Sequence, residues 1–316
     1  MRQGGLPGVK EIEDASRQIA GVACRTPLVE SRPLSRLTGR QVFLKLECFQ
    51  PVKVFKIRGA YNKVSRVEEK GVVAASSGNH GIAVAYSSQL LRKKCTVVVP
   101  ETAVREKVEA IEDCGAEVVR AGRFSDEREA KAREIARAND SAFVHPFDDH
   151  DVIAGQGTCG LEIAEQIADF DTVLVPVGGG GLISGVSIAL KEMGVAAKVI
   201  GVEPAVAPKL AAALAAKKVV RVRPAGSVAD GLVPSALGEL TYLACSKYVD
   251  GALTVSEEEI MGATSAMAKA ARIFAEPSGA APLAPLLSRK GDFGDRVVLV
   301  VSGGNVSQDA LRRALV

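Results

Sequence analysis

Residues 54–61, Val-Phe-Lys-Ile-Arg-Gly-Ala-Tyr, lie where a strand-like apolar run over 42–47 gives way to a helical pattern. Lys56 therefore stands at the start of the predicted helix, directly after an aromatic residue. A lysine in such a place is ordinarily a solvated surface charge. The alternative is an amine buried beside Phe55 and Arg58, where desolvation and the nearby cation lower its pKa and leave a nucleophile. These residues alone do not distinguish the two interpretations, so the rest of the chain has to.

Beyond this stretch, short apolar runs alternate with longer stretches of helical spacing. The runs that we expect as strands are 72–75, 95–100, 117–120, 142–145, 172–177, 198–202 and 296–301. The main expected helices are 9–20, 82–91, 104–114, 126–138, 152–167, 182–193, 257–272 and 279–289. Strands that alternate with helices in this way predict an α/β fold of parallel sheets flanked by helices.

The composition is that of an ordinary globular protein. Of 316 residues, 47% are hydrophobic and 24% are charged, with a net charge of +3. The small net charge and the absence of tryptophan argue against nucleic-acid binding, and no run approaches the roughly 18 apolar residues of a membrane span. The six cysteines are scattered and the first residues form no apolar run, so we expect a cytoplasmic protein with inert thiols.

Three turns share one design, in which a turn rich in Gly, Ser or Asn follows an apolar strand and precedes a helix: 76–81, 178–181 and 302–305. In parallel sheets such turns gather at the carboxyl edge, where ligands bind. The four glycines of 178–181 let several N–H groups point to one place at a helix N-terminus, which suits phosphate. No Lys-Ser/Thr pair follows them, which excludes a nucleotide P-loop.

The glycine turn also permits two other interpretations. It is compatible with a tight turn that binds nothing. It also approaches a dinucleotide-binding pattern, as Gly179-x-Gly181-x-x-Ser184 with Glu203 at the distance expected of a ribose-binding acid. A nicotinamide-dependent oxidoreductase therefore stays open at this point.

The other two turns carry polar side chains. Residues 76–81, Ser-Ser-Gly-Asn-His-Gly, offer hydroxyl, amide and imidazole groups beside exposed N–H groups, which suits a carboxylate or a ring hydroxyl. The hydroxyl of Ser302 suits the nitrogen of a heterocycle. Both turns are equally compatible with ordinary N-caps, because Ser and Asn are favoured cap residues.

A cluster over 145–150 looks at first like a metal site, since it contains His145, Asp148, Asp149 and His150. The two aspartates also suit the N-cap of the helix that is expected from Val152. We favour the capping interpretation, because aspartate is a preferred cap residue and a helical pattern follows directly.

A lysine amine, a phosphate cradle, a carboxylate cradle and a partner for a ring nitrogen together match pyridoxal 5'-phosphate. The chain resembles the threonine dehydratase and serine racemase family, which are fold type II pyridoxal-phosphate enzymes. Six motifs occur in the family's order: 55–60, 76–81, 178–181, 229–231, 276–277 and 302–305. The resemblance implies a two-domain, tryptophan synthase β-like α/β fold with the cofactor in the cleft. Residues 1–70 and 148–316 would form the large domain, and 71–147 the small domain inserted in it.

The resemblance also implies roles for single residues at the cofactor. Lys56 would hold the cofactor through a Schiff base while Phe55 packs against its ring. The remaining cofactor contacts would be Asn79 at the ring hydroxyl, Ser302 at the ring nitrogen, and Gly178, Gly179, Gly180 and Gly181 at the phosphate.

On the substrate side, the resemblance places the carboxylate of an amino acid on the backbone of 76–80, with Ser76, Ser77, Asn79 and His80 as binding residues. Ser77 matches the residue that acts as acid and base on the cofactor face opposite the lysine in the racemases. A group on each face permits racemisation as well as elimination.

The implied reaction is β-elimination, which converts L-threonine or L-serine to 2-oxobutanoate or pyruvate plus ammonia. The alternatives are a serine racemase with side elimination and a 3-hydroxyaspartate dehydratase. Alternatives of another class are the nicotinamide-dependent oxidoreductase and a non-catalytic binding module. The family implies a homo-oligomer, a dimer or a tetramer.

One departure from the family concerns a divalent cation. In the family's cation site, Glu203 and the carbonyl of Ala207 would be followed by a carboxylate, but this chain has Lys209 there. A cation would meet a positive charge at that place, so we expect no metal bound in the family's manner.

Overall fold

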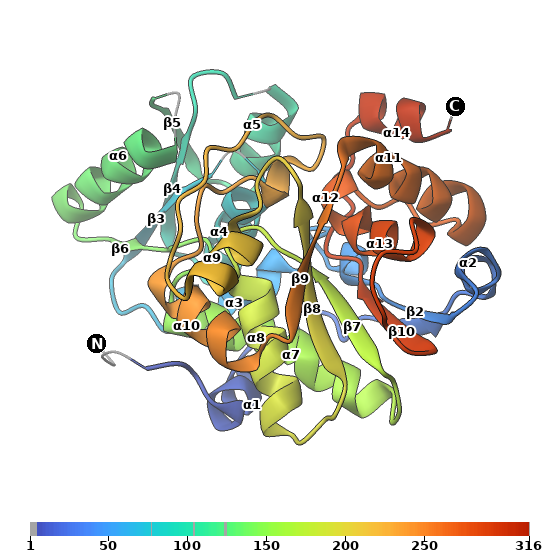
Figure 1. The fold of residues 1–316 in the computed structure, drawn as a ribbon. Coiled ribbons are helices and arrows are strands. Elements are labelled where there is room, and N and C mark those ends of the chain that lie inside the picture. The colour runs from blue at the N-terminus through green and yellow to red at the C-terminus, as the bar shows by residue number, and fades with distance from the viewer. Residues whose placement is uncertain (1–4, 77, 104, 123–124, 316) are drawn as a thin grey trace.

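The computed structural model describes residues 5–76, 78–103, 105–122 and 125–315, and it contains two β-sheets with helices around them (Figure 1). The larger sheet has the strand order β1-β2-β10-β7-β8-β9. Its strands are β1 (Leu28–Glu30), β2 (Gln41–Lys45), β7 (Thr172–Pro176), β8 (Lys198–Pro204), β9 (Gly251–Val255) and β10 (Arg296–Val300). All neighbouring strands in it run parallel except β1 and β2.

The smaller sheet has the order β5-β4-β3-β6, and its strands are parallel throughout. They are β3 (Gly71–Ala75), β4 (Lys94–Val99), β5 (Glu117–Arg120) and β6 (Ala142–Phe143). These strands all fall within 71–147, and the strands of the larger sheet all fall outside it. The parallel α/β class is thus confirmed, while the domain boundaries themselves stay a prediction.

Helices cover the two sheets (Figure 1). In chain order they are α1 (Val9–Gln18), α2 (Arg32–Thr38), α3 (Lys56–Val64), α4 (Asn79–Leu90), α5 (Arg105–Glu112), α6 (Ser125–Ala138), α7 (His150–Gln166), α8 (Gly181–Glu192), α9 (Lys209–Ala216), α10 (Glu239–Tyr248), α11 (Glu257–Ala266), α12 (Pro277–Ala280), α13 (Ala284–Leu287) and α14 (Gln308–Leu315). Short 3-10 turns lie at η1 (Glu47–Phe49), η2 (Asp230–Leu232) and η4 (Ala281–Leu283), and a π-helical turn, η3 (Met267–Ala271), follows α11. None of the described helices has the length and apolar character needed to cross a bilayer.

Residues 297–300 of strand β10 are all apolar and do not alternate with polar residues. Side chains of a strand point alternately to the two faces of its sheet. Val297 and Leu299 pack in a core with residues of α11 and α13, whereas Val298 and Val300 pack in a second core with residues of α7 and α8. Both faces of the larger sheet are therefore covered, which is typical of parallel sheets.

Two details of the expected element order were wrong. The turn over 302–305 does not open a helix directly, because α14 begins only at Gln308. Instead, Gly303 pairs with Val54 in an isolated β-bridge. Four further elements, α2, β1, α10 and β9, were not predicted. The elements α2, β1 and β9 are short, and α10 buries only three of its ten residues, so the apolar pattern is weak in all four.

Candidate active site

Lys56 is the first residue of α3, and its side chain is directed inward. Its Nζ donates a hydrogen bond to the carbonyl of Pro146 at 2.6 Å, and it lies 5.2 Å from the centre of the Phe55 ring. Burial lowers the pKa of Lys56 to about 8. At pH 7 about a tenth of such amines are unprotonated, against about 0.03% for an ordinary lysine. The reactive-amine interpretation is therefore supported over the surface-charge one.

The expectation that the cation of Arg58 lowers the pKa of Lys56 was wrong. Its guanidinium is fully buried and binds the carboxylates of Glu47 and Glu162, at 2.7–2.8 Å, so it does not act on the lysine. Desolvation is the one cause of the lowered pKa of Lys56. Side chains two positions apart on a helix point to different faces, which is why the neighbouring cation does not contribute.

Backbone pairing brings Lys56 to the last of the three turns. The N–H of Phe55 donates to the carbonyl of Ser302 at 3.0 Å, and the N–H of Gly304 donates to the carbonyl of Lys53 at 2.8 Å. With the bridge between Val54 and Gly303, these bonds join two segments about 250 positions apart in the chain. Ser302 is buried at this junction, adjacent to the predicted nucleophile.

The four glycines of 178–181 form a turn in which side chains have no room. Gly180 has a φ of +95°, which favours glycine, and a Cβ on Gly179 would lie 2.2 Å from the ring of Phe147. A Cβ on Gly181 would also touch Phe147. Because Pro146 precedes Phe147, the acceptor of the Lys56 amine and the aromatic cover of the glycine turn are consecutive residues.

This glycine turn has the character of an anion site. It leads directly into α8, and the backbone N–H groups of 178–183 donate to no protein acceptor within the described part of the chain. Free N–H groups at the start of a helix, together with its dipole, favour a bound phosphate. A phosphate-bearing cofactor with an aldehyde thus fits what the residues offer: N–H groups for the phosphate and the Lys56 amine for the aldehyde.

Asn79 begins α4 and belongs to a small, half-buried network. Its Nδ2 donates to Oε1 of Glu276 at 2.8 Å, and its Oδ1 accepts from Nδ2 of Asn305 at 2.8 Å. Burial raises the pKa of Glu276 to about 7. Glu276 and Asn305 both lie in motifs that the sequence shows, but the sequence does not connect them with Asn79, because nothing local links residues about 200 positions apart.

Two other residues of the 76–81 turn, His80 and Ser76, have polar partners within the protein. His80 is buried, its Nε2 is 3.0 Å from the carbonyl of Val144, and burial together with the charge of Lys56 lowers its pKa to about 3. Its imidazole is thus neutral and occupied, which leaves its backbone as the group available to a substrate. Oγ of Ser76 accepts from the N–H of Gly78 at 3.2 Å, and Ser77 lies outside the described residues.

The cluster over 145–150 contains two helix caps. Asp149 accepts from the N–H groups of Asp151 and Val152 and so caps α7, as predicted. Asp148 was expected at the same helix but instead accepts from the first three N–H groups of α10, at 2.9–3.1 Å. No group of three or more His, Cys, Asp or Glu side chains suited to a metal occurs among the described residues.

Glu203 is not placed for the ribose of a dinucleotide. Its side chain is fully buried, and its two oxygens accept from the N–H groups of Leu210 and Ala211 at the start of α9. Oε2 also accepts from Lys209, whose amine lies between Glu203 and the carbonyl of Ala207. The two oxygens that the sequence suggested as weak metal ligands therefore converge on a lysine.

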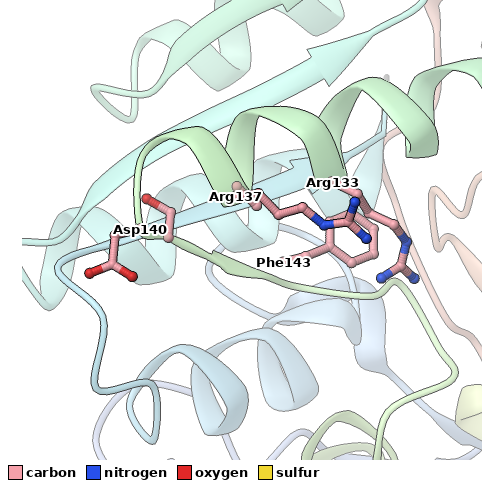
Figure 2. Close-up of a pocket in the computed structure, with 6 residues that line it drawn as sticks. Arg133, Arg137, Asp140 and Phe143 are labelled. Carbon is pink, nitrogen blue, oxygen red and sulfur yellow. The ribbon is translucent and has the colours of Figure 1, made fainter.

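A separate surface hollow of about 230 Å³ lies at the end of α6 (Figure 2). It is lined by Arg133, Arg137, Asp140 and Phe143, and the guanidinium of Arg133 lies 4.3 Å from the centre of the Phe143 ring. None of the predicted site residues lines it. Its charged groups are surface side chains, and Arg133 is already paired with Glu129.

The chain is similar to known enzymes over nearly all of its length. A model of the family described as pyridoxal-phosphate dependent enzymes matches residues 19–303. The L-threonine ammonia-lyase of Thermotoga maritima is 41% identical over 311 residues, which cover 97% of this chain and 78% of that protein. The L-threo-3-hydroxyaspartate ammonia-lyase of Saccharomyces cerevisiae is 37% identical, covering 95% and 94%. The structure of maize serine racemase matches with a TM-score of 0.92 and 33% identity, covering 98% and 96%.

Proposed function

Because this chain belongs to the pyridoxal-phosphate-dependent enzyme family, we propose that it is an ammonia-lyase that acts on small β-hydroxy amino acids. The observation that carries the proposal is the pairing of a partly neutral Lys56 amine with a glycine turn whose N–H groups find no acceptor among the described residues, linked through Pro146 and Phe147. The relatives named L-threonine ammonia-lyase and L-threo-3-hydroxyaspartate ammonia-lyase support this activity. We propose L-threonine and L-serine as substrates and 2-oxobutanoate or pyruvate plus ammonia as products.

The residues that would hold the cofactor follow from the site. The free N–H groups of 178–183 would bind its phosphate, and Lys56 would bind its aldehyde carbon through a Schiff base. Ser302 would face its ring nitrogen and Asn79 its ring hydroxyl, with Phe55 against the ring. When bound, the cofactor supplies an electron sink that stabilises negative charge at the α-carbon of the substrate.

The protein groups would act in sequence on the substrate. Backbone N–H groups at the start of α4 would hold its carboxylate, since a helix N-terminus favours an anion. The Nζ of Lys56 would remove the α-proton of the substrate. Phe55 and Phe147 would exclude water from the reacting carbon. Loss of the α-proton and of the β-hydroxyl, which would leave as water, would form a carbon–carbon double bond. The released enamine would tautomerise to an imine, which water would hydrolyse to the keto acid and ammonia.

A product analysis tests the proposed activity. The pure protein, loaded with pyridoxal phosphate, is incubated separately with L-threonine, L-serine and L-threo-3-hydroxyaspartate, and keto acid and ammonia are measured. We expect equal amounts of the two products and the highest kcat/KM with L-threonine or L-serine. Preference for hydroxyaspartate would overturn the substrate assignment, and absence of turnover with all three would overturn the lyase.

Serine racemase is the second candidate, because the maize enzyme of that name matches the whole fold. The same incubations are therefore also assayed for D-serine. If Ser77 acts on the face opposite Lys56, Ser77→Ala should lower racemisation more than elimination. Equal losses of both would contradict a two-face arrangement. The homo-oligomeric state and the cytoplasmic location remain predictions within this proposal.

The lowered pKa of Lys56 predicts how cofactor uptake depends on pH. The attacking form is the neutral amine, and protonation removes it as the pH falls below about 8. The rate at which the apoprotein takes up pyridoxal phosphate should therefore rise about tenfold per pH unit below 8 and level off above it. His80, with a pKa of about 3, stays neutral across this range. Stopped-flow absorbance measures this rate, and a midpoint near 10 would contradict the burial of the amine.

A further inference from the structure

Lys209, the first residue of α9, is fully buried. Its Nζ donates to four oxygens: the carbonyls of Val177 at 2.9 Å, Leu232 at 3.0 Å and Ala207 at 3.1 Å, and Oε2 of Glu203 at 3.1 Å. A shell of carbonyl and carboxylate oxygens around one point is what proteins otherwise build around a hard cation. Here the cation belongs to the chain itself.

The contacts require the protonated form of this amine. All four neighbours are acceptors, so a neutral amine would direct its lone pair at an oxygen, whereas an ammonium has three N–H groups to share among them. Burial lowers the pKa of Lys209, and the charge of Glu203 opposes that decrease. The oxygens of Glu203 in turn accept hydrogen bonds from the N–H groups of Leu210 and Ala211.

The ammonium also connects the two segments that shape the start of the glycine turn. The carbonyl of Val177 belongs to the residue directly before Gly178. Leu232 lies in η2, next to Gly231, whose carbonyl oxygen would lie 2.7 Å from a Cβ on Gly178. One amine therefore bonds both to the segment that enters the turn and to the segment that packs against it.

We propose that Lys209 is a positioning residue whose ammonium takes the place of a bound ion and holds the glycine turn in its anion-binding shape. Without it, three carbonyls and a carboxylate would face one another with nothing between them, and Val177 and Leu232 would separate. This inference rests on the proposed function in one respect, because the anion is the phosphate of the cofactor.

The first test removes the positive charge of Lys209. In Lys209→Met the side chain keeps its approximate length but not its charge. We expect a melting temperature roughly 5–10 °C lower for the apoprotein, and a dissociation constant for pyridoxal phosphate at least about tenfold higher. The matched control is Lys191→Met, because Lys191 also bonds a carbonyl, that of Ala197, and a carboxylate, that of Asp250, but is not part of this shell. Equal effects in the two variants would overturn the proposal.

The second test restores the charge from solution. In Lys209→Ala the four oxygens remain and the amine is gone, so ammonium or potassium chloride should raise the melting temperature and the cofactor affinity. Tetramethylammonium chloride at equal ionic strength should not, because it is too large and has no N–H donors. The wild type should respond alike to all three salts. A wild type that is stabilised specifically by potassium or ammonium would overturn the proposal, whether or not the variants fold.

The melting temperatures separate this inference from the proposed function, since they require no cofactor. If the melting temperatures of the apoproteins respond to substitution and salt as expected, but the wild type does not bind pyridoxal phosphate, the proposed function alone would be contradicted. Cofactor binding that is the same in wild type and Lys209→Met would contradict the inference alone.

Discussion

Replacement of Lys56 by alanine should lower kcat with L-threonine by at least about 10³-fold. The substitution removes both the amine that would hold the cofactor and the base that would remove the α-proton. It should also abolish the visible absorption band of the cofactor bound as a Schiff base. Steady-state kinetics and absorbance spectra check the two expectations.

Two further variants make the Lys56 result specific. Lys56→Arg keeps a cation but not a nucleophilic amine, so it should be as inactive as Lys56→Ala. Lys10→Ala, on the exposed face of α1, should leave both kcat and the spectrum unchanged. Substantial activity in Lys56→Arg, or a normal spectrum in either Lys56 variant, would show that another residue holds the cofactor.

Replacement of Arg58 by methionine should lower the free energy of unfolding by about 3–5 kcal/mol. Its guanidinium is fully buried and joins Glu47, on the turn after β2, to Glu162, on α7. Methionine would leave Glu162 with its bond from Lys45, and Glu47 with only the uncharged donors Thr26 and Gln50. Urea denaturation followed by circular dichroism measures the change.

Arg133→Met is the control for a surface ion pair. Arg133 and Glu129 are 46% and 37% exposed, so their pair should contribute less than about 1 kcal/mol. A loss in Arg58→Met no greater than in Arg133→Met would contradict a structural role for the buried network. Because Arg58 lies two residues after Lys56 on the same helix, kcat measured well below the melting temperature reports whether the network also positions the amine.

A feature can be predicted from local sequence when it depends on the residues of a single segment. The alternation of strands and helices predicted the parallel α/β class, because buried parallel strands must be short apolar runs connected by helices. The glycines of 178–181 predicted an anion site, because free N–H groups at a helix start follow from the backbone alone. Helical spacing would also have excluded Arg58 as the cause of the lowered pKa of Lys56, since positions i and i+2 do not face each other.

Local sequence patterns did not predict which distant segments of the chain contact one another. Asp148 and Asp149 are equally good caps by residue type, yet Asp149 caps its own helix and Asp148 caps α10, about 90 positions further along. The bonds between Asn79, Glu276 and Asn305 likewise join three separate motifs. Which of several suitable partners is used depends on where the folded chain brings them, and residue type alone does not specify that.

The sequence by itself determined the fold class, the family and the three turns at which chemistry is expected, because these depend on local backbone preference and on the order of motifs. Only the tertiary structure decided the state of two lysines. Lys56 is desolvated at the carbonyl of Pro146, and Lys209 is surrounded by oxygens of four residues from three separate segments of the chain. The charge and reactivity of an amine are set by its burial and by its partners, and both are properties of the assembled fold.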